Sequence, residues 1–314
     1  MVKMLEGKVA IVTGAGRGLG REEVLLMAKE GCNLVVNDLG AAFDGSGAET
    51  KVADQVAEEC RNLGVKAVAN YDTVTDFNKA KAMIDQAISE FGKLDIVVNN
   101  AGILRDRMLF NMTEQEFDDV LAVHLKGTFN MTRHASAYFR VQGKANESLG
   151  NFGRIINTAS DAGLTGNVGQ TNYGAAKAAI AAFTMNASAE LKKYATVNCI
   201  VPLARTRLTT DATPQMVEIM SKLDESGLDV FNPANVAPMV VFLASDKAEK
   251  INGEVFRVVA DRVMLFQGWH TVNQIKNDHK PFTPQIIAER IKELMKGAPK
   301  RENLFALLGE LVKM

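Results

Sequence analysis

A tyrosine and a lysine stand four residues apart in the alanine-rich stretch NYGAAKAAIAAF, residues 172–183. Alanine favours helix, and on a helix the Tyr173 phenol and the Lys177 ammonium share one face about one turn apart. A positive charge close to a phenol favours the phenolate form, so this pair could take part in proton transfer. The alternative is an exposed aromatic residue beside a solvated lysine. The elements around the pair decide between these interpretations.

A glycine-rich loop, TGAGRGLG at residues 13–20, lies between a short apolar run and a helical one. Gly14, Gly18 and Gly20 would serve a tight turn, close approach of the backbone to a pyrophosphate, and close packing of helix on strand. The helix N-terminus adds N–H donors and a positive dipole end for the anion. Glycine is common in tight turns, but the order strand, loop, helix predicts a dinucleotide site.

The second apolar run ends in VVND, which places Asp38 about 20 residues beyond the glycine-rich loop. A carboxylate there can accept hydrogen bonds from both hydroxyls of the adenosine ribose and would repel a 2′-phosphate. The residues therefore predict NAD as the cofactor in preference to NADP. Two alternatives stay open, because Asp38 could instead cap a turn and Arg17 in the loop could meet a 2′-phosphate.

The overall composition narrows the class of protein. With a formal net charge of −1, we expect no nucleic-acid partner and no binding to an anionic membrane surface. No apolar window approaches the roughly 18 residues of a membrane span, and the N-terminus does not have the pattern of a secretory signal. Three cysteines without CxxC spacing favour reduced thiols in the cytoplasm, and four histidines without ligand spacing predict no metal site.

Strand-like and helical runs alternate along the chain, which is typical of a parallel sheet covered by helices on both faces. The predicted strands span residues 8–14, 33–38, 65–70, 94–102, 153–160, 196–202 and 253–259. The predicted helices span residues 19–29, 49–62, 76–91, 114–140, 172–192 and 234–246. The sequence therefore predicts an α/β fold with a seven-stranded parallel sheet.

After about residue 262 the pattern changes to two amphipathic helical runs joined by loops. Thr283 is expected to cap the first run, with Pro284 at its first position and Gly297 beyond its end. A segment of about 50 residues could form little core alone. We therefore expect residues 263–314 to be a helical extension docked on a domain formed by residues 1–262.

Three motifs in a fixed order resemble the short-chain dehydrogenase/reductase family. They are the TGxxxGxG loop, NNAG at residues 99–102, and Ser160 followed thirteen positions later by the YxxxK pair of Tyr173 and Lys177. The resemblance covers about residues 5–260. It implies a Rossmann-type, doubly wound sheet and hydride transfer with a nicotinamide cofactor. Each motif alone is weak, whereas the ordered set is specific.

The resemblance implies roles for the residues that match. Tyr173 would be the general acid/base that moves the hydroxyl proton, and it needs help because its ordinary pKa is near 10. Lys177 would favour the phenolate and bind the nicotinamide ribose, and Ser160 would hold and polarise the substrate oxygen. The implied cofactor-binding residues are Gly14, Arg17, Gly18, Leu19, Gly20, Asp38, Asp72, Thr73, Asn99, Asn100, Ala101, Gly102, Tyr173, Lys177 and Thr206.

Three segments depart from the family pattern. In VHLKGTF, His124 stands where the family has a catalytic asparagine. A histidine can also relay a proton, and the alternative is a buried histidine bonded to a backbone carbonyl. The loop VPLARTRLT is apparently one residue short, with Thr206 nearest the threonine that holds the carboxamide of the nicotinamide. The usual glycine pair is missing from VFRVVADRVMLF, so the C-terminal geometry transfers least.

A long insertion after the second strand, with NNAGILRDR and VHLKGTF, is similar to the (3R)-hydroxyacyl-CoA dehydrogenase module of multifunctional enzyme type 2 and its stand-alone bacterial relatives. By this analogy the substrate is an acyl-CoA or steroid side-chain thioester, and a 3-hydroxyacyl-CoA is oxidised to the 3-oxoacyl thioester. Arg105, Arg107, Arg205 and Arg207 could bind the phosphates of coenzyme A or only pair with local acids. Residues 213–223 could form an apolar lid or an ordinary amphipathic helix.

Two other functions compete with this one. The same residues could serve a hydroxysteroid or other secondary-alcohol dehydrogenase, or the chain could be a catalytically silent, NAD-binding partner subunit. A basic substrate mouth would favour a thioester, and a closed apolar slot would favour a sterol. The long predicted helices at 114–140 and 172–192 are similar to those that pair in family oligomers. We therefore expect a homodimer or homotetramer, with the extension near an interface or the active-site mouth.

Overall fold

The computed structural model describes residues 3–47, 51–206 and 226–299, together with residues 217, 220, 221, 223, 302, 309 and 310. Their strands form a sheet of order β3-β2-β1-β4-β5-β6-β7-β8. Strands β1 to β7 pair in parallel and β8 is antiparallel to β7. The strands are β1 Val9–Thr13, β2 Asn33–Asn37, β3 Ala67–Asn70, β4 Ile96–Asn99, β5 Gly153–Thr158, β6 Ala195–Pro202, β7 Val255–Val259 and β8 Arg262–Phe266. The sheet is doubly wound, as predicted, and its order reverses between β1 and β4.

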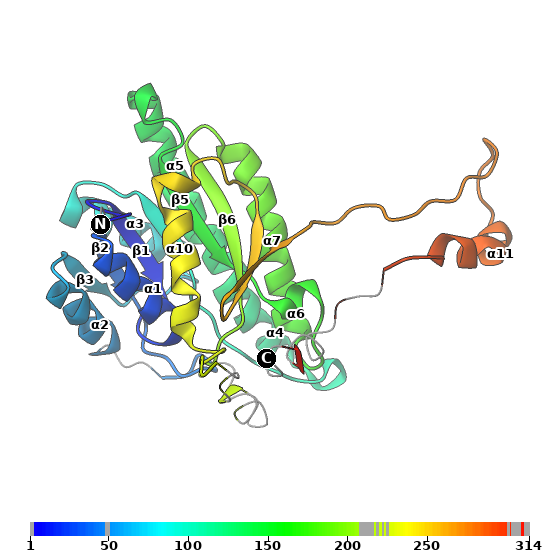
Figure 1. Ribbon diagram of the computed structural model, residues 1–314, viewed down its shortest axis with the longest axis horizontal. Coiled ribbons are helices and arrows are strands. Elements are labelled where there is room, and N and C mark those ends of the chain that lie inside the picture. Colours follow the sequence, from blue (N-terminus) through cyan, green and yellow to red (C-terminus); the bar gives the residue numbers. More distant parts are fainter. Residues whose placement is uncertain are drawn as a thin grey trace.

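Helices cover both faces of this sheet (Figure 1). The α-helices are α1 Gly18–Lys29, α2 Lys51–Asn62, α3 Phe77–Phe91, α4 Glu114–Leu121, α5 Gly127–Ala145, α6 Asp161–Leu164, α7 Thr171–Leu191, α10 Ala237–Ala244 and α11 Pro284–Met295. Short helical turns are η1 Leu109–Asn111, η2 Ala122–Lys126, η3 Glu147–Leu149, η4 Pro233–Asn235 and η5 Asp246–Ala248. Buried apolar residues of α1, α2 and α10 belong to the core of one face, and buried apolar residues of α3 and α5 to the core of the other.

Successive residues of the central strands face these two cores in turn. In β1, Ala10 and Val12 belong to the core under α1, α2 and α10, whereas Val9 and Ile11 belong to the core under α3 and α5. Every residue of β1 is buried. A strand buried on both faces reads as a continuous apolar run, which is why the sequence located these strands.

The eighth strand, β8, was not predicted. It follows β7 through a two-residue turn at Ala260 and Asp261, and it forms the antiparallel edge of the sheet. Ala260 has a φ of +50°, a conformation for which tight hairpin turns usually carry glycine or asparagine. The hairpin signal was therefore absent from the sequence. The sheet continues to Phe266, beyond the proposed domain boundary at residue 262, and the division into two domains remains a prediction.

The helix predicted over residues 114–140 is interrupted. Helix α4 ends at Leu121, a π-helical turn (η2) holds His124, and α5 continues to Ala145. A π turn adds one residue within a helical run, so apolar periodicity does not reveal it. This turn brings His124 beneath the loop that follows β4, where its ring contacts Gly102 and Ile103.

The C-terminal extension leaves the sheet after β8 as a long arm that carries α11 (Figure 1). Thr283 caps α11 by accepting a hydrogen bond from the Ile286 N–H, and Pro284 occupies the first turn, as predicted. No residue of α11 is buried. Most of the second predicted helical run lies outside the described residues, as does most of the candidate lid at residues 213–223.

Candidate active site

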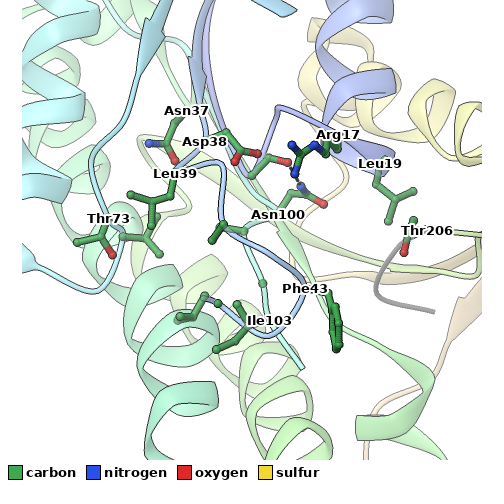
Figure 2. A pocket seen from close by; sticks show the side chains of 18 of the residues that line it. Arg17, Leu19, Asn37, Asp38, Leu39, Phe43, Thr73, Asn100, Ile103 and Thr206 are labelled. Atoms are coloured by element: carbon green, nitrogen blue, oxygen red, sulfur yellow. Dashed lines mark hydrogen bonds between the residues drawn. The ribbon is translucent and has the colours of Figure 1, made fainter. Parts of the chain in front are cut away.

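A cavity of about 300 Å³ opens at the carboxyl ends of β1, β2 and β4, where the strand order reverses (Figure 2). Most residues predicted to bind the cofactor line it: Gly14, Arg17, Gly18, Leu19, Asp38, Asp72, Thr73, Asn100, Ala101, Gly102 and Thr206. Crevices at such a switch point are where open α/β sheets bind ligands. Gly20, Tyr173 and Lys177 lie outside this lining, and the roles predicted for all these residues remain predictions.

The glycine-rich loop is built so that the backbone passes close to other backbone. A Cβ added to Gly14, whose φ is +66°, would lie 2.8 Å from Ala101 Cα. A Cβ on Gly20 would lie 2.3 Å from the Gly14 carbonyl oxygen. Gly14 therefore keeps the cavity open next to the loop after β4, and Gly20 lets α1 pack on the loop, although it does not face the cavity.

The N-terminal turn of α1 suits an anion. Arg17 is its N-cap residue, with no side-chain cap bond, and the first turn contains no acidic residue. The N–H groups of such a turn carry a partial positive charge and need acceptors. Because Arg17, Gly18 and Leu19 line the cavity, a pyrophosphate fits this end of it.

Asp38 already has two backbone partners. Its Oδ2 accepts from the Gly16 N–H at 2.8 Å and its Oδ1 from the Gly40 N–H at 2.6 Å. The turn-capping alternative is thus observed. The carboxylate nevertheless lines the cavity, and each oxygen has a second acceptor site for a ribose hydroxyl.

The two asparagines at the end of β4 face different sides. Asn99 does not line the cavity; its Nδ2 donates to Thr132 and to Asn157 Oδ1 inside the domain. Asn100 lines it instead and donates from Nδ2 to the carbonyl oxygens of Thr13 and Gly14. Consecutive residues of a strand point to opposite sides, so only one of the two asparagines can face the cofactor side.

The insertion after β2 forms a wall of the cavity that motif reasoning missed. Phe43 and Ile103 lie at one end of the cavity (Figure 2). The Phe43 carbonyl oxygen accepts from the Leu104 N–H at 3.0 Å, and a Cβ on Gly45 would lie 3.3 Å from Ile103. The lining residues not named from the sequence are Asn37, Leu39, Ala41, Phe43, Gly45, Val74, Ile103 and Val123. The length and glycine content of the insertion were the available signal.

The predicted catalytic residues meet at the ends of β5 and α7. Ser160 is the N-cap of α6, where its Oγ accepts from the Ala162 N–H at 3.3 Å, and its hydroxyl is close enough to the Tyr173 phenol to lower the pKa of that phenol. Lys177 Nζ lies 5.5 Å from the centre of the Tyr173 ring and donates to the Thr158 carbonyl oxygen at 2.6 Å. Lys177 is only 3% exposed, so the solvated-lysine alternative does not hold.

Burial, more than charge, sets the pKa values of this pair. Desolvation raises the pKa of Tyr173 to about 12; the Ser160 hydroxyl lowers it, while Asp106 and Asp161 raise it further. Desolvation also lowers the pKa of Lys177 to about 8. The sequence led us to expect Lys177 to favour the phenolate. In the protein without ligands, the pKa of Tyr173 is instead raised and that of Lys177 is lowered, because burial disfavours the charged form of both groups.

His124 is buried and bonded to the backbone. Its Nε2 lies 2.8 Å from the Ile103 carbonyl oxygen, and its ring meets that of Tyr173 edge-on at 5.1 Å between centroids. Burial lowers its pKa well below 6.5, and the nearby Lys177 charge adds to this shift. The arrangement matches the alternative of a structural histidine, while Nδ1 has no hydrogen-bond partner within the described part of the chain. A catalytic role for His124 stays a prediction.

The arginines considered for coenzyme A phosphates are paired with local acids. Arg105 lies 3.5 Å from Asp119, Arg107 lies 3.0 Å from Glu116, and Arg205 binds Asp229. Arg207 lies outside the described residues. Across the described ranges, no cluster of three or more His, Cys, Asp and Glu side chains could hold a metal, and no helix is long and apolar enough to cross a membrane.

Known proteins share this arrangement of sequence and fold. The profile of the short chain dehydrogenase family matches residues 8–216. The chain is 41% identical over 304 residues to hydroxyacyl-CoA dehydrogenase ChsB1 of Mycobacterium tuberculosis, covering 96% of this chain and 93% of that protein. It is 35% identical over 314 residues to peroxisomal multifunctional enzyme type 2 of Mus musculus, covering 98% of this chain and 40% of the mouse protein. A solved short chain dehydrogenase from Mycobacterium avium has a TM-score of 0.82 and 42% identity, over 95% of this chain and 98% of that one.

These matches confirm the resemblance inferred from the motifs, including the likeness to the dehydrogenase module of multifunctional enzyme type 2. The cofactor of such proteins is NAD or NADP. The protein belongs to the short-chain dehydrogenase family and is an oxidoreductase.

Proposed function

We propose that this protein oxidises a (3R)-hydroxyacyl-CoA to the 3-oxoacyl-CoA with NAD. The observation that carries the proposal is the meeting of Ser160, Tyr173 and buried Lys177 beside a cavity suited to a dinucleotide. The substrate class is supported by the name of the Mycobacterium tuberculosis relative, a hydroxyacyl-CoA dehydrogenase, and by the likeness to multifunctional enzyme type 2. The chain spans under half of the mouse protein, so only its dehydrogenase step bears on this chain.

The residues divide the work on the substrate hydroxyl. Ser160 holds the oxygen, and Tyr173, as phenolate, accepts the hydroxyl proton. Lys177 lies next to the Tyr173 ring and would bind the nicotinamide ribose. Its bond to the Thr158 carbonyl oxygen fixes the direction of its side chain. The bound nicotinamide supplies the hydride acceptor. In the reverse reaction Tyr173 returns the proton to the oxygen.

The preference for NAD rests on Asp38. Its carboxylate lines the cavity at the end of β2, where it would accept from ribose hydroxyls and repel a 2′-phosphate. Arg17 lines the same cavity and is the feature that would favour NADP. Comparing NAD with NADP at fixed substrate concentration therefore tests which of the two residues dominates.

One observation supports a hydroxysteroid dehydrogenase as the second candidate function. The described arginines of the expected basic rim are paired with acids. In the same region Leu109 and Phe110 are 65% and 79% exposed, next to the bridge between Arg107 and Gln170 at the start of α7. An apolar rim suits a sterol as well as a fatty acyl chain.

The experiment follows absorbance at 340 nm with a (3R)-hydroxyacyl-CoA, its (3S) epimer and a free hydroxysteroid, each with NAD and NADP. NAD reduction by the (3R) thioester alone is the expected result. Turnover of the free steroid alone would reject the thioester proposal and support the second candidate. Turnover of the (3S) epimer would reject the stereochemistry.

We also propose a homodimer or homotetramer in the cytosol. Exposed apolar side chains on α5 and α7, Phe129 and Met185, and the unburied helix α11 support association. Three free, buried cysteines support a reducing compartment. A monomeric mass by light scattering at micromolar concentration would reject the first proposal. Removal of residues 270–314 without effect on mass or KM would reject a role of the extension at an interface or at the active-site mouth.

A further inference from the structure

Arg257, on β7, joins two parts of the chain that are far apart in sequence. It is 2% exposed, and its Nε donates to Asp161 Oδ1 at 2.9 Å. On the other side, Nη1 and Nη2 donate to the two carboxylate oxygens of Glu302 at 2.8 and 2.7 Å. The guanidinium also lies 4.5 Å over the Phe266 ring. A cation this buried requires such pairing, because an unpaired one would bear the full cost of desolvation.

The first carboxylate is next to a catalytic residue. Asp161 directly follows Ser160 and is the first residue of α6, a helix of only four residues. A helix that short has no stability of its own, so its position depends on contacts with the domain. The Arg257 bond to Asp161, which is 3% exposed, supplies such a contact from strand β7. The direction of the Ser160 side chain therefore depends on the Arg257–Asp161 pair.

The second carboxylate belongs to the C-terminal extension. Glu302 lies beyond α11, and its side chain remains 47% exposed while it binds the guanidinium in bidentate fashion. Bidentate arginine–carboxylate pairs fix orientation as well as charge. Glu302 therefore holds the Arg257 plane in the orientation that its bond to Asp161 requires. Arg257 lowers the pKa of Glu302, so the contact persists at neutral pH.

We propose that Glu302 and Arg257 are positioning residues through which the C-terminal extension orients Ser160 against Tyr173. The inference rests on the proposed function in one respect, that Ser160 acts on the substrate oxygen. It also predicts a purely structural effect, because residues of α6 should loosen when a contact some 140 positions later is removed. That effect can be measured without substrate.

The test compares Glu302→Ala and Glu302→Gln with a control, Glu293→Gln, in the same extension. Glu293 is exposed and pairs with Arg290 within α11, so its loss should not reach the active site. Hydrogen–deuterium exchange of residues 159–166 is measured by mass spectrometry, with kcat, KM and NADH binding measured alongside. For Glu302→Ala we expect exchange of residues 159–166 to become about tenfold faster and kcat to fall about tenfold. NADH binding should not change. Glu302→Gln should show a smaller effect in the same direction.

Arg257→Lys provides a second variant that keeps the charge and loses the planar fork, and it should act like Glu302→Ala. Unchanged exchange in residues 159–166 for both variants would overturn the inference. Faster exchange with unaltered kcat would also overturn it, because Ser160 would then not need the anchor. A wild-type protein without activity on any of the three alcohols would reject the proposed function, and the exchange result alone would still decide whether the extension anchors α6.

Discussion

The cofactor side of the site is built mainly from backbone, whereas the catalytic side is built from buried, charged side chains. On the cofactor side, Gly14 and Gly20 allow close passage of chain segments, and the first turn of α1 offers N–H groups. On the catalytic side, Lys177 and Arg257 are 3% and 2% exposed, and their partners come from other elements. Backbone sites depend on local sequence, and side-chain sites depend on what the fold buries around them.

The largest expected effect comes from a substitution that alters the catalytic side alone. Tyr173→Phe removes the phenolic oxygen that would accept the substrate proton beside the Ser160 hydroxyl. We expect kcat to fall by about 10³-fold or more, with NADH affinity unchanged within about twofold, because the cofactor side does not use the phenol oxygen. Stopped-flow kinetics and NADH fluorescence titration measure the two quantities. An active Phe variant would reject the assigned mechanism.

A buried carboxyl group on α1 offers a test of the comparison itself. Glu23 on α1 is fully buried, and its oxygens have no hydrogen-bond partner among the residues described. Burial raises its pKa from 4.5 to about 8. A raised folded pKa gives stability that is present below pH 4.5 and is lost as the pH rises toward 8.

Glu23→Gln should therefore stabilise the protein at pH 8 relative to pH 5 by about 3 kcal/mol compared with wild type. Chemical denaturation at the two pH values measures this difference. Glu22→Gln is the matched control, since Glu22 lies on the same helix and pairs with Arg21. Equal pH dependence of wild type and Glu23→Gln would show that the carboxyl is solvated or partnered in solution.

A methyl group tests the backbone construction of the cofactor side. Gly20→Ala would place a Cβ 2.3 Å from the Gly14 carbonyl oxygen, so the loop or α1 must move. We expect a loss of about 2 kcal/mol in stability and about tenfold in NADH affinity. Gly268→Ala is the control, because its Cβ would only meet Met185 at an ordinary 3.5 Å. If both variants bind NADH like wild type, close packing at Gly20 does not matter for the site.

The smallest expected effect concerns Asp38, one of the two carboxylates that line the cavity, with Asp72. Asp38→Asn should reduce the preference for NAD over NADP, measured as a ratio of kcat/KM values, by about tenfold, since the repulsion of a 2′-phosphate is lost. It also replaces one of the two carboxylate oxygens that accept from the Gly16 and Gly40 N–H groups, so the melting temperature is measured in parallel. An unchanged ratio would assign Asp38 to turn capping alone.

Most of the fold was accessible from the sequence because parallel strands and their helices have strong local patterns. The seven parallel strands were placed within a few residues, and the Thr283 cap of α11 was identified. The strand β8 and the π turn at His124 were missed, because the first lacks turn residues and the second adds a residue without altering the apolar pattern. Of the candidate site, the glycine loop and the Ser160, Tyr173 and Lys177 set were readable from spacing.

The sequence by itself determined the features that are encoded within a few residues or by ordered motifs. These are the β1–loop–α1 unit, the spacing of the serine, tyrosine and lysine, and the family. What only the tertiary structure decided is which charges meet. In the sequence Arg257 is only a residue within an apolar strand, but in the folded protein it lies between Asp161 and Glu302. Likewise the pKa values of Tyr173 and Lys177 follow burial that spacing cannot report. Desolvation and ion pairing depend on every element packed around a group, and that information appears only when the chain is folded.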